Sequence, residues 1–293
     1  MTKAESKKQF SNLFQSMTGR HSPWKIWEDM VWLFATTISN VVDGQYREER
    51  EQQYLKIAKQ HSTAEMEKYA KMFAMLVDVY EGGWSDFLGE LFMELELGND
   101  HGGQFFTPYS VCKCMASISL PDITEKVEKA GYVSINDPAC GAGATLIAAA
   151  DIILNDYKIN YQQHALFIGQ DIDYTTALMC YIQLSLLGCA GYVRVGNTLT
   201  DPGTGHVLFG NRDANTWYTP MYYHVTWKTR RTSHILRNVF HREPRGEPLE
   251  EPAAVEETQA APPEPETVDA PEIIQVGGKQ AKQQHEGQLM FDL

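Results

Sequence analysis

The chain has 293 residues, 43% of them apolar, which is enough to bury a core in one large domain or two ordinary ones. No export signal precedes its five cysteines, and this odd number excludes a disulfide framework and predicts reduced thiols in the cytoplasm. The net charge of −13 is concentrated in one acidic segment near the end, so it does not exclude a nucleic-acid partner for the rest of the chain.

Neither a membrane partner nor a metal site is expected. The most apolar early stretch, residues 31–38, is far shorter than a helix that spans a bilayer. Cys112 and Cys114 lack the second Cys or His pair that zinc sites use, so no bound metal is predicted.

Residues 1–98 are predicted to form a helical N-terminal region, with helices between about 24 and 97. Apolar side chains recur there at steps of three and four, which places them on one helix face. These are Met66, Tyr69, Phe73, Val77 and Tyr80. Nothing in this region indicates catalysis, so we interpret it as a packing domain.

Residues 99–240 are predicted to form an α/β domain. Thr107 and Pro108 suggest a helix start, with Thr as the N-cap. Strands are then expected at 133–136, 165–170 and 192–195, and helices at 145–155 and 175–187. This β-α-β-α-β order calls for a parallel sheet with helices on its faces, a Rossmann-like arrangement.

The end of the α/β domain is basic and the tail after it is acidic. Four basic residues are candidates for contact with DNA: Lys228, Arg230, Arg231 and Arg237. A solvated charged surface is the alternative. The tail, 241–293, carries nine acidic residues and no Lys or Arg between Glu247 and Glu272, and it is expected to be disordered.

The apolar terminal peptide, Gln288 to Leu293, loosely resembles peptides that bind bacterial replication sliding clamps. A plain chain end without a partner is the favoured interpretation, and the docking peptide is the alternative.

The strongest chemical signal is the segment 136–145, Asn-Asp-Pro-Ala-Cys-Gly-Ala-Gly-Ala-Thr, between a strand and a helix. Glycines at this place let the main chain approach a nucleotide-like ligand, and the next helix offers free N–H groups. Leu146 replaces the third glycine of a dinucleotide-binding loop, which disfavours a nicotinamide cofactor. Asp171, at the end of the second strand, can accept hydrogen bonds from the two ribose hydroxyls, and Asp173 can cap the next helix.

Four segments together resemble N6-adenine DNA methyltransferases, in particular the modification subunits of type I restriction systems. They are Gly-Gln-Phe-Phe-Thr-Pro at 103–108, Asp-Pro-Ala-Cys-Gly-Ala-Gly at 137–143, Gly-Gln-Asp-Ile at 169–172 and Gly-Asn-Thr-Leu at 196–199. They occur in the family's order. The resemblance implies a class I methyltransferase fold, of which this chain carries the cofactor-binding half, and S-adenosylmethionine as cofactor.

The resemblance also implies roles for individual residues. Phe106, Thr107 and Pro108 would line the methionine end of the cofactor. Asp137, Pro138, Gly141 and Gly143 form the loop that would hold its amino-acid moiety. Asp171 would bind the ribose and Asn197 the adenine edge.

The family's catalytic segment, Asp/Asn-Pro-Pro-Tyr/Phe after the fourth strand, is missing, because the chain's one Pro-Pro pair lies in the acidic tail. The weak candidates for its place are Asn215, Pro220 and Tyr222. The aromatic residues of this stretch are better interpreted as a packed strand or cover. About 40 residues between Thr200 and the tail are also too few for the second half of the fold.

The sequence therefore predicts an adenine-specific DNA methyltransferase that binds S-adenosylmethionine and DNA, with a partner subunit supplying catalytic or target-recognition parts. The alternative is a non-catalytic module that binds the cofactor and associates with DNA and a partner chain.

Overall fold

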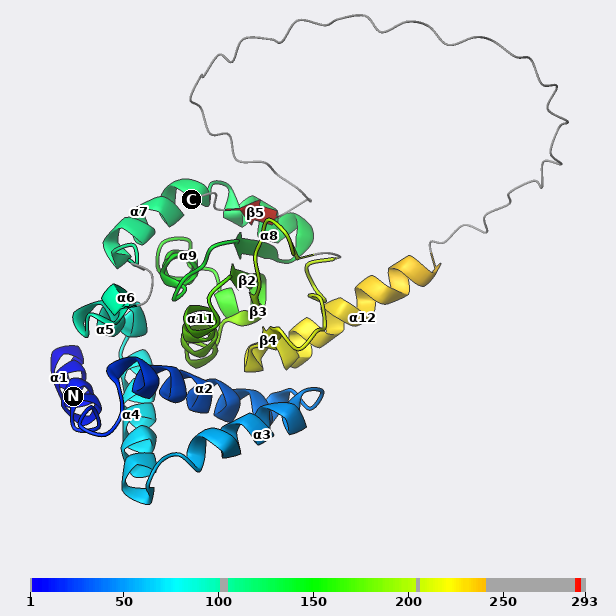
Figure 1. Ribbon diagram of the computed structural model, residues 1–293. Coiled ribbons are helices and arrows are strands. Elements are labelled where there is room, and N and C mark those ends of the chain that lie inside the picture. Colours follow the sequence, from blue (N-terminus) through cyan, green and yellow to red (C-terminus); the bar gives the residue numbers. More distant parts are fainter. Residues whose placement is uncertain (1, 101–104, 204–205, 241–287, 291–293) are drawn as a thin grey trace, which may run out of the picture.

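A computed structural model describes residues 2–100, 105–203, 206–240 and 288–290 (Figure 1). The first hundred residues are helical, as predicted. The helices are α1 (Lys3–Gln15), α2 (Pro23–Val42), α3 (Arg47–Ala58), α4 (Thr63–Glu81), α5 (Phe87–Glu94) and α6 (Leu97–Asp100). Ser22 and Ser62 cap α2 and α4 by accepting from main-chain N–H groups of the first turn, which explains where these helices begin.

The buried face of α4 differs slightly from the predicted one. Tyr69 and Tyr80 are buried as expected, but Met66, Phe73 and Val77 are only partly buried. The centre of the face is formed instead by Met72, Leu76 and Val79. Both sets have helical spacing, so the sequence indicated the helix correctly and its rotation only approximately.

One sheet of five strands follows, in the order β4-β3-β2-β1-β5. The strands are β1 (Val133–Asp137), β2 (Ala165–Asp171), β3 (Ala190–Val195), β4 (Thr216–Tyr218) and β5 (Gln288–Met290). β1, β2, β3 and β5 are parallel, and β4 pairs antiparallel with β3. The predicted α/β fold with a mainly parallel sheet is therefore confirmed, and the three predicted strands each extend one or two residues further.

The remaining helices are α7 (Tyr109–Ser119), α8 (Ile123–Ala130), α9 (Ala144–Asn155), α10 (Tyr161–His164), α11 (Tyr174–Leu186), the short 3-10 helix η1 (Pro220–Tyr223) and α12 (Val225–Phe240). α7 begins later than predicted, with Pro108 at the N-cap position and no side-chain cap, so Thr107 is not the cap. α11 packs between the sheet and α2, which explains why it is apolar nearly all round (Figure 1).

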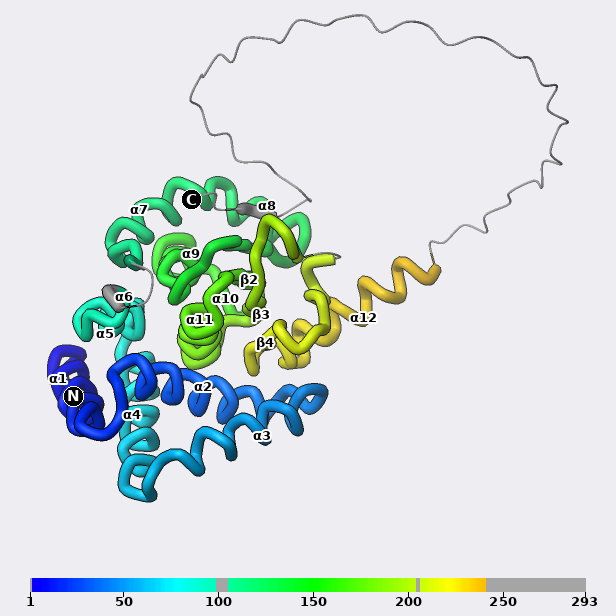
Figure 2. Tube along the Cα trace, in the orientation of Figure 1, coloured from blue at the N-terminus to red at the C-terminus, as the bar shows by residue number. Residues whose placement is uncertain are grey.

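Both faces of the sheet are covered by apolar side chains. Successive residues of a strand point to opposite faces, and β2 shows this clearly. Phe167 joins the large core that the sheet shares with α9, α11 and the helical region. Leu166 and Ile168 join a smaller core, which contains the buried aromatic side chains of β4, η1 and α12. α12 therefore seals the second face with its first turns, and its far end runs away from the sheet (Figure 2).

Most of the predicted acidic tail lies outside the described residues, namely 241–287 and 291–293. Gln288–Met290 is a strand, β5, that pairs with β1 from Ser134 to Asn136. The terminal peptide was interpreted as a plain chain end or, alternatively, as a docking peptide, so this pairing was not predicted. Among the helices of the described residues, none is long and apolar enough to cross a membrane.

Candidate functional site

The loop between β1 and α9 has two glycines with positive φ, 51° at Gly141 and 96° at Gly143. A side chain at Gly143 would also place its Cβ 2.7 Å from Sγ of Cys180 on α11. At Gly141 a Cβ would stand 3.2 Å from the ring of Phe106. The glycines are therefore required by the turn and by packing against α11 and Phe106.

Asp171 ties this loop to the end of β2. Its carboxylate accepts hydrogen bonds from the main-chain N–H of Gly141 at 2.8 Å, from that of Asp173 at 2.9 Å and from the hydroxyl of Thr176 at 3.1 Å. Because two carboxylate oxygens offer about four acceptor positions, the three bonds leave room for a ligand hydroxyl. The chain itself thus holds Asp171 in place beside the glycine loop.

A cavity of about 280 Å³ lies where these parts meet. Phe106, Thr107, Gly141, Thr145 and Asp171 are among the residues that line it. The structure therefore brings together residues predicted from three separate segments of the sequence. Ligand pockets usually measure about 300 to 1,000 Å³, and the volume of this cavity lies just below that range. The cavity can therefore hold part of a nucleoside-sized ligand.

Three lining residues lie outside the segments predicted to form the site, namely Asp86, Cys112 and Thr176. Asp86 caps α5 by accepting from the N–H of Gly89 at 3.0 Å, and it also accepts from Nε2 of Gln183 at 2.8 Å. Burial raises the pKa of Asp86. Only the fold brings α5 to this cavity, so no local pattern could have indicated Asp86.

Five predicted cofactor residues do not line the cavity: Pro108, Asp137, Pro138, Gly143 and Asn197. Pro108 precedes α7, and the main-chain oxygen of Pro138 accepts from the Thr198 hydroxyl. The Asn197 side-chain oxygen accepts from the N–H of Leu199 at 2.9 Å, so it stabilises the turn after β3.

Asp137 is fully buried under the loop. One carboxylate oxygen accepts from the N–H of Ala139 at 3.1 Å, and the other has no hydrogen-bond partner among the described residues. Burial raises the pKa of Asp137 to about 6, and the hydrogen bond from Ala139 opposes this. Asp137 therefore stabilises the conformation of the glycine loop through its hydrogen bond with Ala139.

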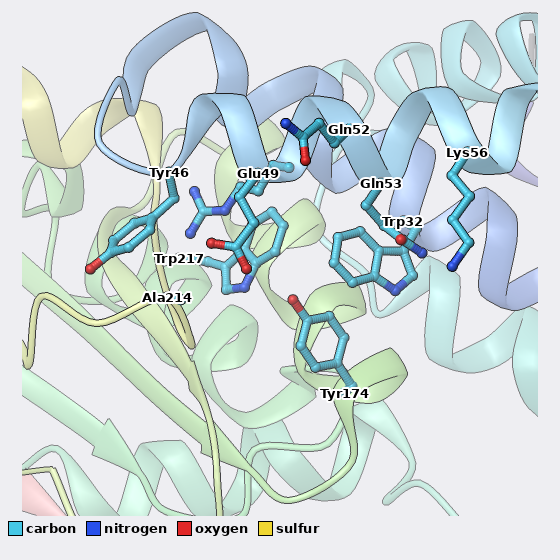
Figure 3. Close-up of a pocket in the computed structure, with 10 residues that line it drawn as sticks. Trp32, Tyr46, Glu49, Gln52, Gln53, Lys56, Tyr174, Ala214 and Trp217 are labelled. Carbon is cyan, nitrogen blue, oxygen red and sulfur yellow. The ribbon is translucent and has the colours of Figure 1, made fainter.

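A second cavity, of about 400 Å³, lies between the helical region and β4 (Figure 3). Trp32 stacks on Tyr174 there, with ring centroids 4.9 Å apart, and meets Trp217 edge-on at 5.7 Å. Tyr174 and Thr176 are two positions apart at the start of α11, so they point to different sides of the helix. The first turn of α11 therefore separates the two cavities.

Arg50, on α3, lines the second cavity and contacts residues of both α2 and β4 around it. Its guanidinium lies 3.8 Å from the ring of Trp217 and donates to Asp43 at 2.8 Å and to the main-chain oxygen of Thr216 at 3.1 Å. Arg50 and Asp43 are both buried. A buried charge is tolerated only when it is paired, so Asp43 stabilises Arg50 in this position. The contacts of Arg50 with Thr216 and Trp217 join the helical region to β4.

The three weak catalytic candidates lie outside the first cavity and have structural roles elsewhere. The main-chain oxygen of Asn215 accepts from the N–H of Val195 at 2.9 Å, beside β4. Pro220 opens η1, and the hydroxyl of the buried Tyr222 donates to the main-chain oxygen of Leu208 at 2.7 Å. The buried aromatics of this stretch, Trp217, Tyr218, Tyr222 and Trp227, form the cover that the sequence analysis preferred, while Tyr223 is 38% exposed.

All four predicted DNA-binding residues lie on α12, but two of them pack against the body. Arg230 stacks on Trp227 and donates to the main-chain oxygen of Gly131 at 2.7 Å. Arg231 stacks on Tyr222 and donates to its main-chain oxygen at 2.9 Å. Lys228 and Arg237 are exposed.

Comparison with known proteins gives one family and two similar structures. The model of the N-6 DNA methylase family matches residues 46–243. A candidate class I S-adenosylmethionine-dependent methyltransferase of Listeria monocytogenes is 18% identical with a TM-score of 0.43, and the comparison covers 70% of this chain and 56% of that one. The methyltransferase subunit of a type I restriction-modification system of Streptococcus thermophilus is 18% identical with a TM-score of 0.36, covering 67% and 45%.

The chain thus spans about half the length of these two proteins. The family model, in contrast, matches well over half of the present chain, and the matched residues include α3 to α12. It also contains all four segments on which the resemblance was based. The chain belongs to the N-6 DNA methylase family.

Proposed function

We propose that the first cavity binds S-adenosylmethionine. The observation that carries this proposal is the position of Asp171, whose carboxylate faces the same cavity as the glycine loop and retains acceptor capacity. A ribose offers two neighbouring hydroxyl donors, and the acceptor position that Asp171 retains can take one of them. The membership of the family supports the same cofactor.

The chemistry of the lining fits the rest of this ligand. The ring of Phe106 and the exposed ring of Phe105 offer apolar area, and Thr107 and Thr145 offer hydroxyls. Asp86 places a carboxyl group in the same cavity, where it can attract the positive sulfonium or amino group. When bound, the cofactor supplies a methyl group activated by the sulfonium. The chain's own residues orient it and exclude water from one side.

We further propose that the target is adenine in DNA and that the second half of the site comes from a partner chain. The family membership supports the substrate. The need for a partner follows from the candidates for the missing catalytic segment, because Asn215, Pro220 and Tyr222 do not line the cofactor cavity. Lys228 and Arg237, exposed on α12, are the remaining candidates for phosphate contact.

The alternative, a non-catalytic module that associates with a partner, is favoured by one feature of α12. Ile235, Leu236, Val239 and Phe240 are all between 48% and 78% exposed near its end. Apolar side chains gathered on a protruding helix are typical of an interaction surface. Both proposals use the same cofactor cavity and differ in whether methyl groups are transferred.

Two measurements separate them. Calorimetric titration of the chain with S-adenosylmethionine tests the cavity, and the absence of binding would refute both proposals. Transfer of a radiolabelled methyl group to DNA, assayed with the chain alone and with gene products encoded beside it, tests the enzyme. Cofactor binding without incorporation under either condition would leave the interaction module.

A further inference from the structure

Two histidines and a glutamate from separate segments meet in the helical region. His21 lies between α1 and α2, His61 lies just before α4, and Glu65 is in the first turn of α4. One ligand atom from each lies within 4.8 Å of the other two. The residues are 40 and 4 positions apart along the chain, so no short motif revealed them.

Both histidines have a buried ring nitrogen that makes no hydrogen bond within the described part of the chain, although each lies near Glu65, at 3.4 Å for His21 and 4.0 Å for His61. Nε2 of His21 and Nδ1 of His61 make no hydrogen bond to any described residue. The His61 residue is only 8% exposed, so water does not replace the missing partner freely. Because an unsatisfied buried polar atom is costly, two of them aimed at one carboxylate point to a bound group between them.

The opposite side of His61 is fixed by a carboxylate. Its Nε2 lies 2.8 Å from an oxygen of Asp29, and because a carboxylate only accepts, the single proton of the neutral ring that a metal ligand requires is on this nitrogen. Asp29 is in turn held by Nζ of Lys25 at 2.6 Å. The lone pair of His61 is therefore on Nδ1, toward the cluster. A carboxylate that orients a histidine in this way is the usual outer partner of a metal ligand.

Two hydrogen bonds from Ser62 fix the orientation of the Glu65 carboxylate. One of its oxygens, Oε2, accepts from the N–H of Ser62 at 2.7 Å and from the Ser62 hydroxyl at 2.8 Å. The other oxygen, Oε1, lies 3.4 Å from Nε2 of His21.

We propose that His21, His61 and Glu65 bind a divalent transition-metal ion, with Zn²⁺ the best match. Two ligands of a tetrahedral zinc ion, each at about 2.0 to 2.1 Å, lie about 3.3 Å from one another. The distance between Nε2 of His21 and Oε1 of Glu65, 3.4 Å, already matches this ligand–ligand distance. The widest separation, 4.8 Å, requires a closure of at most about 1.5 Å, which the loops before α2 and α4 can supply.

Two imidazoles and one carboxylate are a known zinc ligand set, with a water in the fourth position. The ion would join the loop after α1 to the start of α4. Its role would be to stabilise the helical region, independently of the cofactor cavity.

The test is a calorimetric titration of the metal-stripped full chain with zinc chloride. We expect one Zn²⁺ per chain, and a Co²⁺-loaded sample with the absorption spectrum of tetrahedral coordination. His21→Gln should weaken zinc binding by at least about 100-fold, and Asp29→Asn, which removes only the outer partner, by about 10- to 100-fold. Zinc should raise the Tm of the wild type and not that of His21→Gln.

His164→Gln is the matched control, because His164 is half-buried and its Nδ1 lies 2.8 Å from the main-chain oxygen of Gly131, outside the cluster. It should bind zinc as the wild type does. Circular dichroism would show whether each variant folds. The proposal is overturned if the wild type binds no stoichiometric zinc, or if folded His21→Gln binds it with unchanged affinity.

Discussion

Replacing Asp171 by alanine would remove the carboxylate that joins the glycine loop to α11 and faces the first cavity. If Asp171 holds the ribose of the cofactor, the lost hydrogen bonds are worth about 1–3 kcal/mol. This corresponds to an increase in Kd of about 5- to 150-fold. Calorimetric titration with S-adenosylmethionine at a temperature well below the Tm of both proteins would measure it.

Asp171→Ala would also lower the free energy of unfolding, since three hydrogen bonds within the chain end on this carboxylate. Asp173→Ala separates the two effects. Asp173 caps α11 by accepting from the N–H of Thr176 at 2.8 Å but does not line the cavity. It should therefore cost about 1 kcal/mol of stability and leave Kd unchanged. A folded Asp171→Ala protein with the wild-type Kd would refute the assignment.

Two further changes test the loop itself. Gly143→Ala should lower the free energy of unfolding by about 2–4 kcal/mol in urea titrations, because it combines a positive φ with a Cβ 2.7 Å from the Cys180 sulfur. Gly203→Ala, where nothing lies within 4 Å of the new Cβ, should change stability by less than about 0.5 kcal/mol, and equal effects would contradict the packing argument. For Asp137, the folded pKa of about 6 exceeds the ordinary value of 3.8, so its contribution to stability is present at pH 4 and is lost as the pH rises to about 6. Asp137→Asn should remove this dependence and gain about 2 kcal/mol relative to the wild type between pH 4 and pH 7, while a constant difference across that range would show that Asp137 is not desolvated.

The three strands β1, β2 and β3 and their connection through helices could be predicted because local signals agreed. Residues 165–170 are apolar and bounded by turns, and the next helix carries its own cap at Asp173, which the structure confirms. Asp171 and Gly141 could be placed together on the same grounds, since parallel strands end at one edge of the sheet. The general outline of the site follows from this rule.

Contacts between distant segments could not be predicted in the same way. Asp86 reaches the first cavity only because α5 packs beside α11, and Arg50 reaches Trp217 across more than 160 positions of the chain. For Arg230 the charge suggested contact with DNA, and the sequence did not reveal that the guanidinium stacks on an aromatic ring. Such choices depend on tertiary packing, which composition does not encode.

The pairing of β5 with β1 has a consequence for how the protein is handled. An uncovered outer strand presents a row of main-chain donors and acceptors that can recruit another molecule, and here three residues from the far end of the chain occupy that row from Ser134 to Asn136. Without them the outer edge of the sheet would pass from the three residues of β5 to the longer strand β1. Shortened versions should therefore self-associate more readily as their concentration rises, even though every residue of the cofactor cavity is intact.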